Sequence, residues 1–293
     1  MMRIIKYLFQ SIIIYLFFII GKIIGIKLSR SLFGYLFKKF GPLFKSKKVI
    51  KKNLENLKNL TEEEKKNIIF KMWKNIGMVA AEFFHLRKIS EERNTRIKVI
   101  GEEYINKYKN NGVIFVSGHF ANWEIIPLIL RNYRNNVGGI YRHSNNFFVN
   151  NWVVRQRYKN TTPIQIRKGS SGAREMLNLL RKNGAIAMLV DQKLSSGVRV
   201  NFFGSDAMTS DGAASLAIKY NYPVIPMNVE RTKGSNFKVS FHPEIKVNKT
   251  SDKQNDIKAF TTEINKFLEQ CITKNPEGWF WIHNRWDKKF NLN

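Results

Sequence analysis

Cysteine, histidine and acidic residues are scarce in this chain of 293 residues. The single cysteine, Cys271, excludes an internal disulfide, so a reducing compartment is the default expectation. The five histidines and this cysteine form no C-x-x-C or H-E-x-x-H spacing, and we predict no metal site and no cofactor. We also find no internal repeat and no low-complexity tract. The length suffices for one large domain or two small ones, so size does not limit the fold.

The shortage of acidic residues leaves the chain strongly basic. Fifty Lys and Arg stand against 22 Asp and Glu, which gives a formal net charge of +28. Such a charge implies an anionic partner: nucleic acid, an acidic membrane surface, or an acidic protein or substrate. The abundance of Lys, Asn and Ile indicates that compositional bias supplies part of it. No nucleic-acid-binding module is recognisable and the aromatic residues fall mostly on apolar faces, so we predict no nucleic-acid partner.

The N-terminus carries one long apolar run, residues 4–26. It is uncharged from Tyr7 to Gly21, which is about one membrane span if the flanking lysines reach the interface. No small-residue cleavage site follows, as a signal peptide would require, and the basic cluster that comes next predicts a cytoplasmic main body. We interpret residues 1–27 as a membrane anchor that spans the bilayer or lies in its interface. A signal peptide and a buried helix are the alternatives.

A basic helical segment, residues 28–95, follows this anchor. Within it, Thr61 and Glu64 have the spacing of a capping box, which predicts a helix from this point to about residue 87. Beyond it, short apolar runs alternate with amphipathic ones. We predict strands over 113–117, 138–142, 163–166, 185–190 and 223–229, an edge strand over 237–247, and helices from about 122 and over 146–159, 171–182, 211–220 and 254–274. This rhythm predicts an α/β domain, residues 96–293, with a mostly parallel central sheet flanked by helices.

The stretch GHFANWE, residues 118–124, is the strongest candidate for catalysis. His119 follows a predicted strand and precedes a helix, where reactive groups of α/β sheets collect. It would act as a general base, and Glu124, reaching back from the first helical turn, would orient its ring. By itself the H-x-x-x-x-E pattern is weak, and a structural histidine in a tight turn is the alternative. A zinc site built from His119, His143 and Glu124 is a weaker hypothesis, because no sequence spacing supports the choice of the third ligand.

The block VSGHFANWE resembles the signature of the lipid A biosynthesis acyltransferases, the late lauroyl and myristoyl transferases. These are related more distantly to glycerolipid acyltransferases with an H-x-x-x-x-D motif. The resemblance continues, in order, through most of the chain. It includes TEEEKKNIIFKMWKNIGMVAAEF (61–83), YRHSNN (141–146), RQR (155–157), IRKGSSGAREMLNLLRKNGAIAMLVDQ (166–192), VNFFGSDAMTSDGAASLAIKYNYPVIPM (200–227) and PEGWFWIHNRW (276–286).

The resemblance implies an O-acyltransferase at the cytoplasmic face of the inner membrane. Its donor would be an acyl-carrier-protein thioester, and its acceptor a hydroxyl of a phosphorylated, glucosamine-based glycolipid, the precursor of lipid A in lipopolysaccharide biosynthesis. Inner-membrane lipids would be further partners. The glutamate of the H-x-x-x-x-E motif argues against a glycerophosphate acceptor. A phosphatidylinositol-mannoside-like acceptor remains an alternative, and a membrane-tethered nucleic-acid binder a remote one.

The resemblance also implies substrate-binding residues. Arg157 and Arg167 match arginines of the family, and Arg142 follows a predicted strand at a position that would face the site. All three would hold acidic groups of the acceptor bidentately. Asp191, at the end of the strand over 185–190, would position an arginine or a sugar hydroxyl. Lys193 departs from the family pattern, which puts the acceptor headgroup in doubt.

Overall fold

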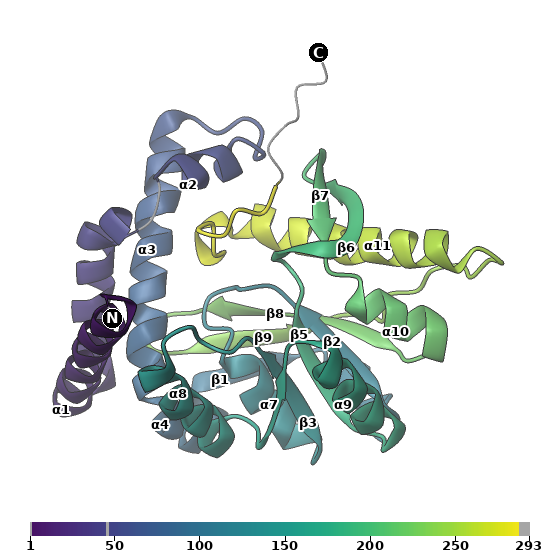
Figure 1. The fold of residues 1–293 in the computed structure, drawn as a ribbon, viewed down its shortest axis with the longest axis horizontal. Coiled ribbons are helices and arrows are strands. Elements are labelled where there is room, and N and C mark those ends of the chain that lie inside the picture. The colour runs from purple at the N-terminus through teal and green to yellow at the C-terminus, as the bar shows by residue number, and fades with distance from the viewer. Residues whose placement is uncertain (1, 45–46, 287–293) are drawn as a thin grey trace.

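The fold is built on a seven-stranded sheet made from short apolar runs (Figure 1). The structure is a computed structural model and describes residues 2–44 and 47–286. Its strands are β1 (Ile97–Ile100), β2 (Val113–Ser117), β3 (Val137–Tyr141), β4 (Ile164–Arg167), β5 (Ala185–Leu189), β8 (Val224–Arg231) and β9 (Phe237–Phe241). They lie in the order β1-β9-β8-β2-β5-β3-β4. All five residues of β2 are buried, as expected of a central strand covered by helices on both faces.

The prediction of a mostly parallel sheet is confirmed. β8, β2, β5, β3 and β4 run parallel to one another, whereas β9 is antiparallel to β8, and β1 is parallel to β9. The predicted edge strand over 237–247 is wrong in its position, because β1 covers the outer side of β9. Four-residue β1 lies between short helices and is too brief to show a clear alternation in the sequence.

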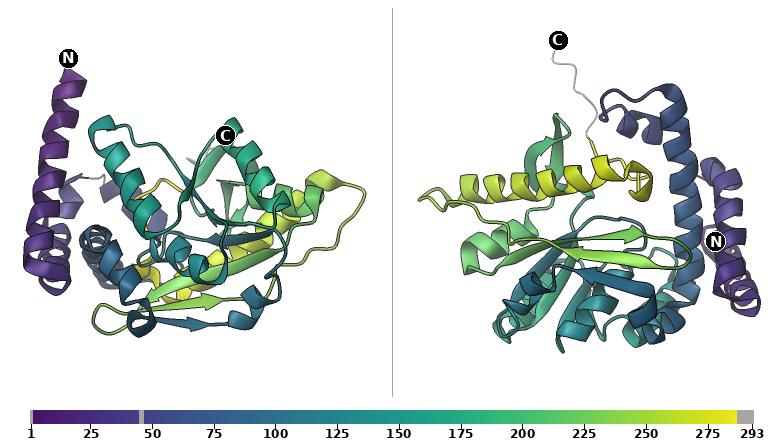
Figure 2. Two further views of the ribbon diagram at one scale, coloured as in Figure 1. Left: turned by 90° about the horizontal axis from the view of Figure 1, so that it is seen from below. Right: turned by 180° about the vertical axis from the view of Figure 1, so that it is seen from behind.

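Helices cover both faces of this sheet (Figures 1 and 2). They are α1 (Met2–Phe44), α2 (Lys47–Leu54), α3 (Glu62–Phe84), α4 (Leu86–Glu91), α5 (Arg93–Arg96), α6 (Glu102–Asn106), α7 (Ile125–Tyr133), α8 (Phe147–Asn160), α9 (Ser170–Arg181), α10 (Gly212–Tyr220) and α11 (Lys253–Lys274). Alternate residues of β2 enter different cores. Val113 and Phe115 pack with α7, while Ile114 and Val116 pack with α10 and α11. This is the two-residue period of a strand between two helical layers.

Two local features explain how α3 joins the sheet domain. Its capping box is confirmed: Thr61 Oγ1 accepts from the Glu64 backbone N–H at 3.2 Å, and Glu64 Oε2 accepts from the Thr61 backbone N–H at 2.7 Å. Met72 and Trp73 of α3 are buried in the same hydrophobic core as β2 and α11. The helical segment is therefore packed into the core of the sheet domain.

The N-terminal helix α1 is bent at Gly25, whose φ of 73° favours glycine. It contains a stretch, Met2–Leu43, that is long and apolar enough to cross a membrane, with a mean hydropathy of 2.1 in its most apolar window. Large apolar side chains such as Ile5, Phe9 and Ile23 lie exposed on its surface. The first half of α1 stands beside α8, at the margin of the sheet domain (Figure 2).

A short antiparallel hairpin, absent from our sequence predictions, follows β5. It comprises β6 (Lys193–Phe202) and β7 (Ser205–Thr209). Phe203 and Gly204 form its turn with positive φ values of 54° and 75°. The hairpin packs on α11, and it brings Phe202 into the core beside Trp279 and Trp286. The hairpin thereby packs against Trp279 and Trp286, which follow α11 in the chain.

Candidate active site

The ends of two neighbouring strands bring His119 and Asp191 together. β2 and β5 are parallel, and Ser117, the last residue of β2, is paired with Leu189, the last residue of β5. His119 and Asp191 each come two residues later. Carboxyl ends of parallel strands lie at the same edge of a sheet, where α/β proteins bind their ligands. The strand register alone therefore puts these two side chains next to each other.

Asp191 holds the histidine through two hydrogen bonds. Its Oδ1 lies 2.7 Å from His119 Nδ1, and its Oδ2 accepts from the His119 backbone N–H at 2.8 Å. The Trp279 indole N–H also donates to Oδ2, at 2.7 Å. Burial alone would raise the pKa of Asp191, but His119 and these hydrogen bonds outweigh it and keep the pKa below its usual value. The group is thus a carboxylate, which only accepts.

This contact decides which ring nitrogen of His119 would accept a proton. A carboxylate cannot donate, so Nδ1 carries the proton that points to Asp191, and Nε2 keeps its lone pair. The side-chain amide nitrogen of Gln192 lies 3.4 Å from His119 Nε2 and can donate a hydrogen bond to it. The histidine side chain is 17% exposed, against 2% for Asp191. Nε2 is therefore the nitrogen through which a neutral His119 ring would accept a proton.

Aromatic rings enclose the histidine. The His119 ring lies 5.1 Å from the Trp123 ring and 5.9 Å from the Phe280 ring, measured between centroids. Gly118 allows the Phe120 ring and the Asp191 carboxylate to approach the backbone closely, since a Cβ at this position would stand 2.7 Å from the Phe120 ring and 3.3 Å from Asp191 Oδ2. Such a partly dry surrounding strengthens the electrostatic interactions of the groups inside it.

Glu124 does not orient His119, and that prediction is wrong. Its carboxylate instead forms a forked ion pair with Arg157 of α8: Oε2 accepts from Nε at 3.0 Å and Oε1 from Nη2 at 2.5 Å. The carboxylate is 6% exposed. Burial lowers the pKa of Arg157, but the charge of Glu124 outweighs this and raises it. Glu124 directly precedes α7, so it points along the helix surface to α8 and not back to the turn.

The arginines predicted to bind the acceptor differ in their surroundings. Arg157 is occupied by Glu124, as described above. Arg142 directly follows β3 and Arg167 ends β4, and both are exposed. Tyr141 and Arg167 are paired across these parallel strands, so the two arginines lie at the same sheet edge as His119. In the described part of the chain neither has an ion-pair partner. Asp191, which we expected to position an arginine or a sugar hydroxyl, holds His119.

Sequence reasoning missed a buried ionic cluster behind the GHFANWE turn. Glu82 of α3 is fully buried. Arg231 of β8 contacts both of its carboxylate oxygens, through Nη1 at 2.5 Å and Nη2 at 2.8 Å, and Arg30 Nε of α1 lies 2.7 Å away. Asn122 of the GHFANWE turn donates to the same carboxylate at 2.9 Å. A charged residue in the otherwise apolar run VAAEFF was the signal available in the sequence.

This cluster supports the backbone of the turn. Asn75 accepts from Arg231 Nε at 2.6 Å and donates to the Ala121 carbonyl at 3.0 Å. Ala121 has a φ of 45°, an unfavourable conformation for alanine. Its N–H donates to the Gly278 carbonyl at 2.8 Å. Helix α7 begins at Ile125, three residues later than predicted, because this left-handed turn precedes it.

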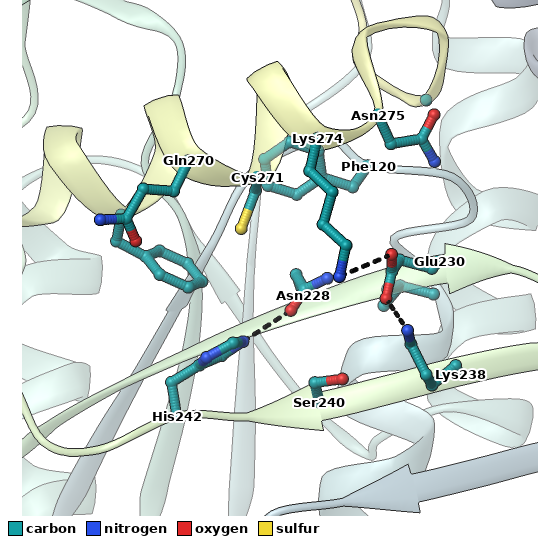
Figure 3. A pocket seen from close by; sticks show the side chains of 13 residues that line it. Phe120, Asn228, Glu230, Lys238, Ser240, His242, Gln270, Cys271, Lys274 and Asn275 are labelled. Atoms are coloured by element: carbon teal, nitrogen blue, oxygen red, sulfur yellow. Dashed lines mark hydrogen bonds and ion pairs between the residues drawn. The ribbon is translucent and has the colours of Figure 1, made fainter.

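A cavity of about 230 Å³ lies between α11 and the strands β8 and β9, away from His119 and Asp191 (Figure 3). Glu230 contacts both Lys238 and Lys274 there. Cys271 also lines it, and burial raises the pKa of its thiol to about 12, which makes it a poor nucleophile. Within the described ranges, no group of three or more His, Cys, Asp and Glu side chains is placed to hold a metal ion.

Comparison with known proteins identifies the family of this chain. Residues 1–288 match the sequence model of the bacterial lipid A biosynthesis acyltransferases. The chain belongs to this family. It is 26% identical to a lipid A biosynthesis acyltransferase of Haemophilus influenzae over 86% of this chain and 81% of that protein. It is 25% identical to a lipid A biosynthesis lauroyltransferase of Escherichia coli over 81% of this chain and 78% of that protein.

A solved structure with a related description is also similar. It is the 1-acyl-sn-glycerophosphate acyltransferase of Thermotoga maritima, at 14% identity, with 91% of this chain and 95% of that chain covered. The TM-score is 0.39, too low to add to the description of the fold. The family itself makes this protein an acyltransferase of lipid A biosynthesis, and its apolar N-terminal helix suggests membrane association.

Proposed function

We propose that the protein transfers a fatty acyl chain from an acyl-carrier-protein thioester to a hydroxyl of a phosphorylated, glucosamine-based glycolipid. The observation that carries the chemistry is the Asp191 carboxylate on Nδ1 of His119, at 2.7 Å. It leaves Nε2 as the ring nitrogen that would accept a proton. A hydroxyl is a weak nucleophile at neutral pH, so a positioned base is what this reaction needs.

The reaction follows from these groups. Nε2 takes the hydroxyl proton as the oxygen attacks the thioester carbonyl carbon. The resulting tetrahedral intermediate carries an oxyanion, and its collapse breaks the carbon–sulfur bond. The imidazolium then returns the proton to the leaving thiolate, so the products are an ester and a free thiol. Asp191 stabilises the imidazolium while it exists, and no acyl-enzyme forms.

The charges around the site suit the two substrates. Arg142 and Arg167 are exposed at the sheet edge and would bind phosphates of the acceptor. Arg157 takes a different role from the one we expected: through Glu124 it joins α8 to the start of α7. The net charge of +28 would speed encounters with an acidic carrier protein and with anionic lipid headgroups.

The location we propose is the inner membrane, with the catalytic domain on its cytoplasmic face. The apolar part of α1 would anchor the chain there. The basic residues that follow it, beginning with Lys27 and Arg30, favour the cytoplasmic side.

Mass spectrometry of total glycolipid tests the proposal. Cells that contain the wild-type protein should gain a lipid species heavier by one acyl group, and cells with His119→Ala should lose it. The purified variant should be slower by roughly 10²–10⁴, the usual share of a general base. The parent ion identifies the acceptor. A mass gain on a phospholipid or a mannoside would therefore contradict the proposed glucosamine-based acceptor, but it would still support acyl transfer. Equal rates for the two proteins would contradict the role of His119.

A further inference from the structure

A purely apolar groove lies between α1, α3 and α8. Its volume is about 490 Å³, and every described residue that lines it is aliphatic or aromatic. Ile13 and Phe17 of α1, Ala80 and Phe83 of α3, and Val149 and Trp152 of α8 form its walls. For comparison, an apolar protein cavity of roughly 150 Å³ binds benzene. The groove has the size and chemistry for a hydrocarbon chain.

One end of the groove adjoins the ion pair of Arg157 and Glu124. The Phe83 ring contacts Trp152 at 5.7 Å between centroids, and the Arg157 guanidinium carbon lies 5.9 Å from the Phe83 centroid. Arg157 in turn binds Glu124 of the GHFANWE stretch. A single aromatic side chain therefore contacts both the groove and the charged pair beside the catalytic turn.

The opposite wall belongs to the apolar surface of α1. Ile13 lines the groove and is 39% exposed, while its neighbours Ile12 and Leu16 are more than half exposed. Two hydrogen bonds fix this helix to α8: the Tyr15 hydroxyl donates to the Phe148 carbonyl at 2.9 Å, and Asn146 Nδ2 donates to the Tyr7 carbonyl at 2.9 Å. The groove is thus a built part of the fold, and it is continuous with the surface expected to meet lipid.

We propose that this groove binds a hydrocarbon chain of the membrane-borne acceptor. The proposal rests on the proposed function and adds the acceptor's chain subsite to it. A chain already in the bilayer could pass along α1 into the groove without crossing water. The donor chain arrives on a soluble carrier from the aqueous side, so the lipid-facing wall favours the acceptor as the occupant.

Photo-cross-linking of the full-length wild-type protein tests the occupant directly. One probe is a phosphorylated glucosamine disaccharide lipid with a chain-terminal diazirine, in phosphatidylglycerol and phosphatidylethanolamine vesicles. The other is acyl-carrier protein loaded with the same diazirine chain. We expect the lipid probe to label α8 around Val149 and Trp152, and the carrier-borne chain to label other peptides. Labelling of α8 by the carrier-borne chain alone, or by neither probe, would overturn the proposal.

A variant that fills the groove gives a kinetic readout. Ala80→Phe should raise the KM for the lipid acceptor at least tenfold and leave the KM for the donor unchanged, because each methylene kept in water costs roughly fourfold in affinity. Ala259→Phe, an exposed position on α11, is the matched control. An unchanged acceptor KM in a folded Ala80→Phe protein contradicts the groove. Absence of transfer by the wild-type protein, with α8 still labelled, would contradict the proposed function and leave the groove standing.

Discussion

Replacing Asp191 by asparagine should abolish the basicity of His119 Nε2 while it preserves the shape of the site. Two N–H groups converge on Asp191 Oδ2, from the His119 backbone at 2.8 Å and from Trp279 at 2.7 Å. Asparagine has one carbonyl oxygen, and that oxygen must take the Oδ2 position to keep both hydrogen bonds. Its NH₂ group then faces Nδ1 and donates, so the ring proton moves to Nε2.

The expected loss is the whole contribution of the base. With its proton on Nε2, the imidazole cannot accept one from the acceptor hydroxyl, so the rate should fall by roughly 10²–10⁴. Residues that act as a unit are not additive. The double variant Asp191→Asn with His119→Ala should therefore be no slower than His119→Ala alone.

Initial rates of acyl transfer to a lipid acceptor in detergent micelles measure this effect. Asp206→Asn is the matched control, because its carboxylate lies on β7 and is 66% exposed. Thermal unfolding checks that each variant is folded. A parent-like rate for Asp191→Asn, or multiplicative losses in the double variant, would refute the inference that Asp191 sets the tautomer.

Two further predictions concern stability. Glu82→Gln should cost roughly 3–5 kcal/mol of unfolding free energy, because it removes the buried carboxylate that pairs with two largely enclosed arginines, Arg30 and Arg231. Glu91→Gln, at an exposed ion pair with Arg87, should cost far less. Equal losses in denaturant unfolding would contradict the importance of the buried cluster. Burial lowers the pKa of His242, so near that pKa the unfolded state binds more protons than the native state. The free energy of unfolding should therefore be highest above about pH 6.5, the pKa of histidine in the unfolded chain, and should fall as the pH drops below it. His242→Gln should flatten that fall in melting temperature, His143→Gln at an exposed site should not, and a pH profile unchanged by His242→Gln would count against it.

Features that depend on neighbouring residues were readable from the sequence. The capping box of Thr61 and Glu64, five of the parallel strands and the place of His119 after β2 follow from local patterns, and the structure confirms them. The order of motifs along the chain was enough to indicate the family. Weak or brief local signals failed, as the missed strand β1 and the hairpin of β6 and β7 show.

The partners of the candidate catalytic side chains were decided by the tertiary structure. His119 and Asp191 were both identified, yet we paired His119 with Glu124, its neighbour in the sequence. Their actual contact depends on β2 and β5 being adjacent, parallel and in a register that pairs Ser117 with Leu189. Likewise, Glu124 reaches Arg157 only because the fold brings α8, which is distant in the sequence, to the start of α7. Strand order and helix packing result from burial of apolar surface over the whole chain, so no local stretch of sequence encodes which distant charges will meet.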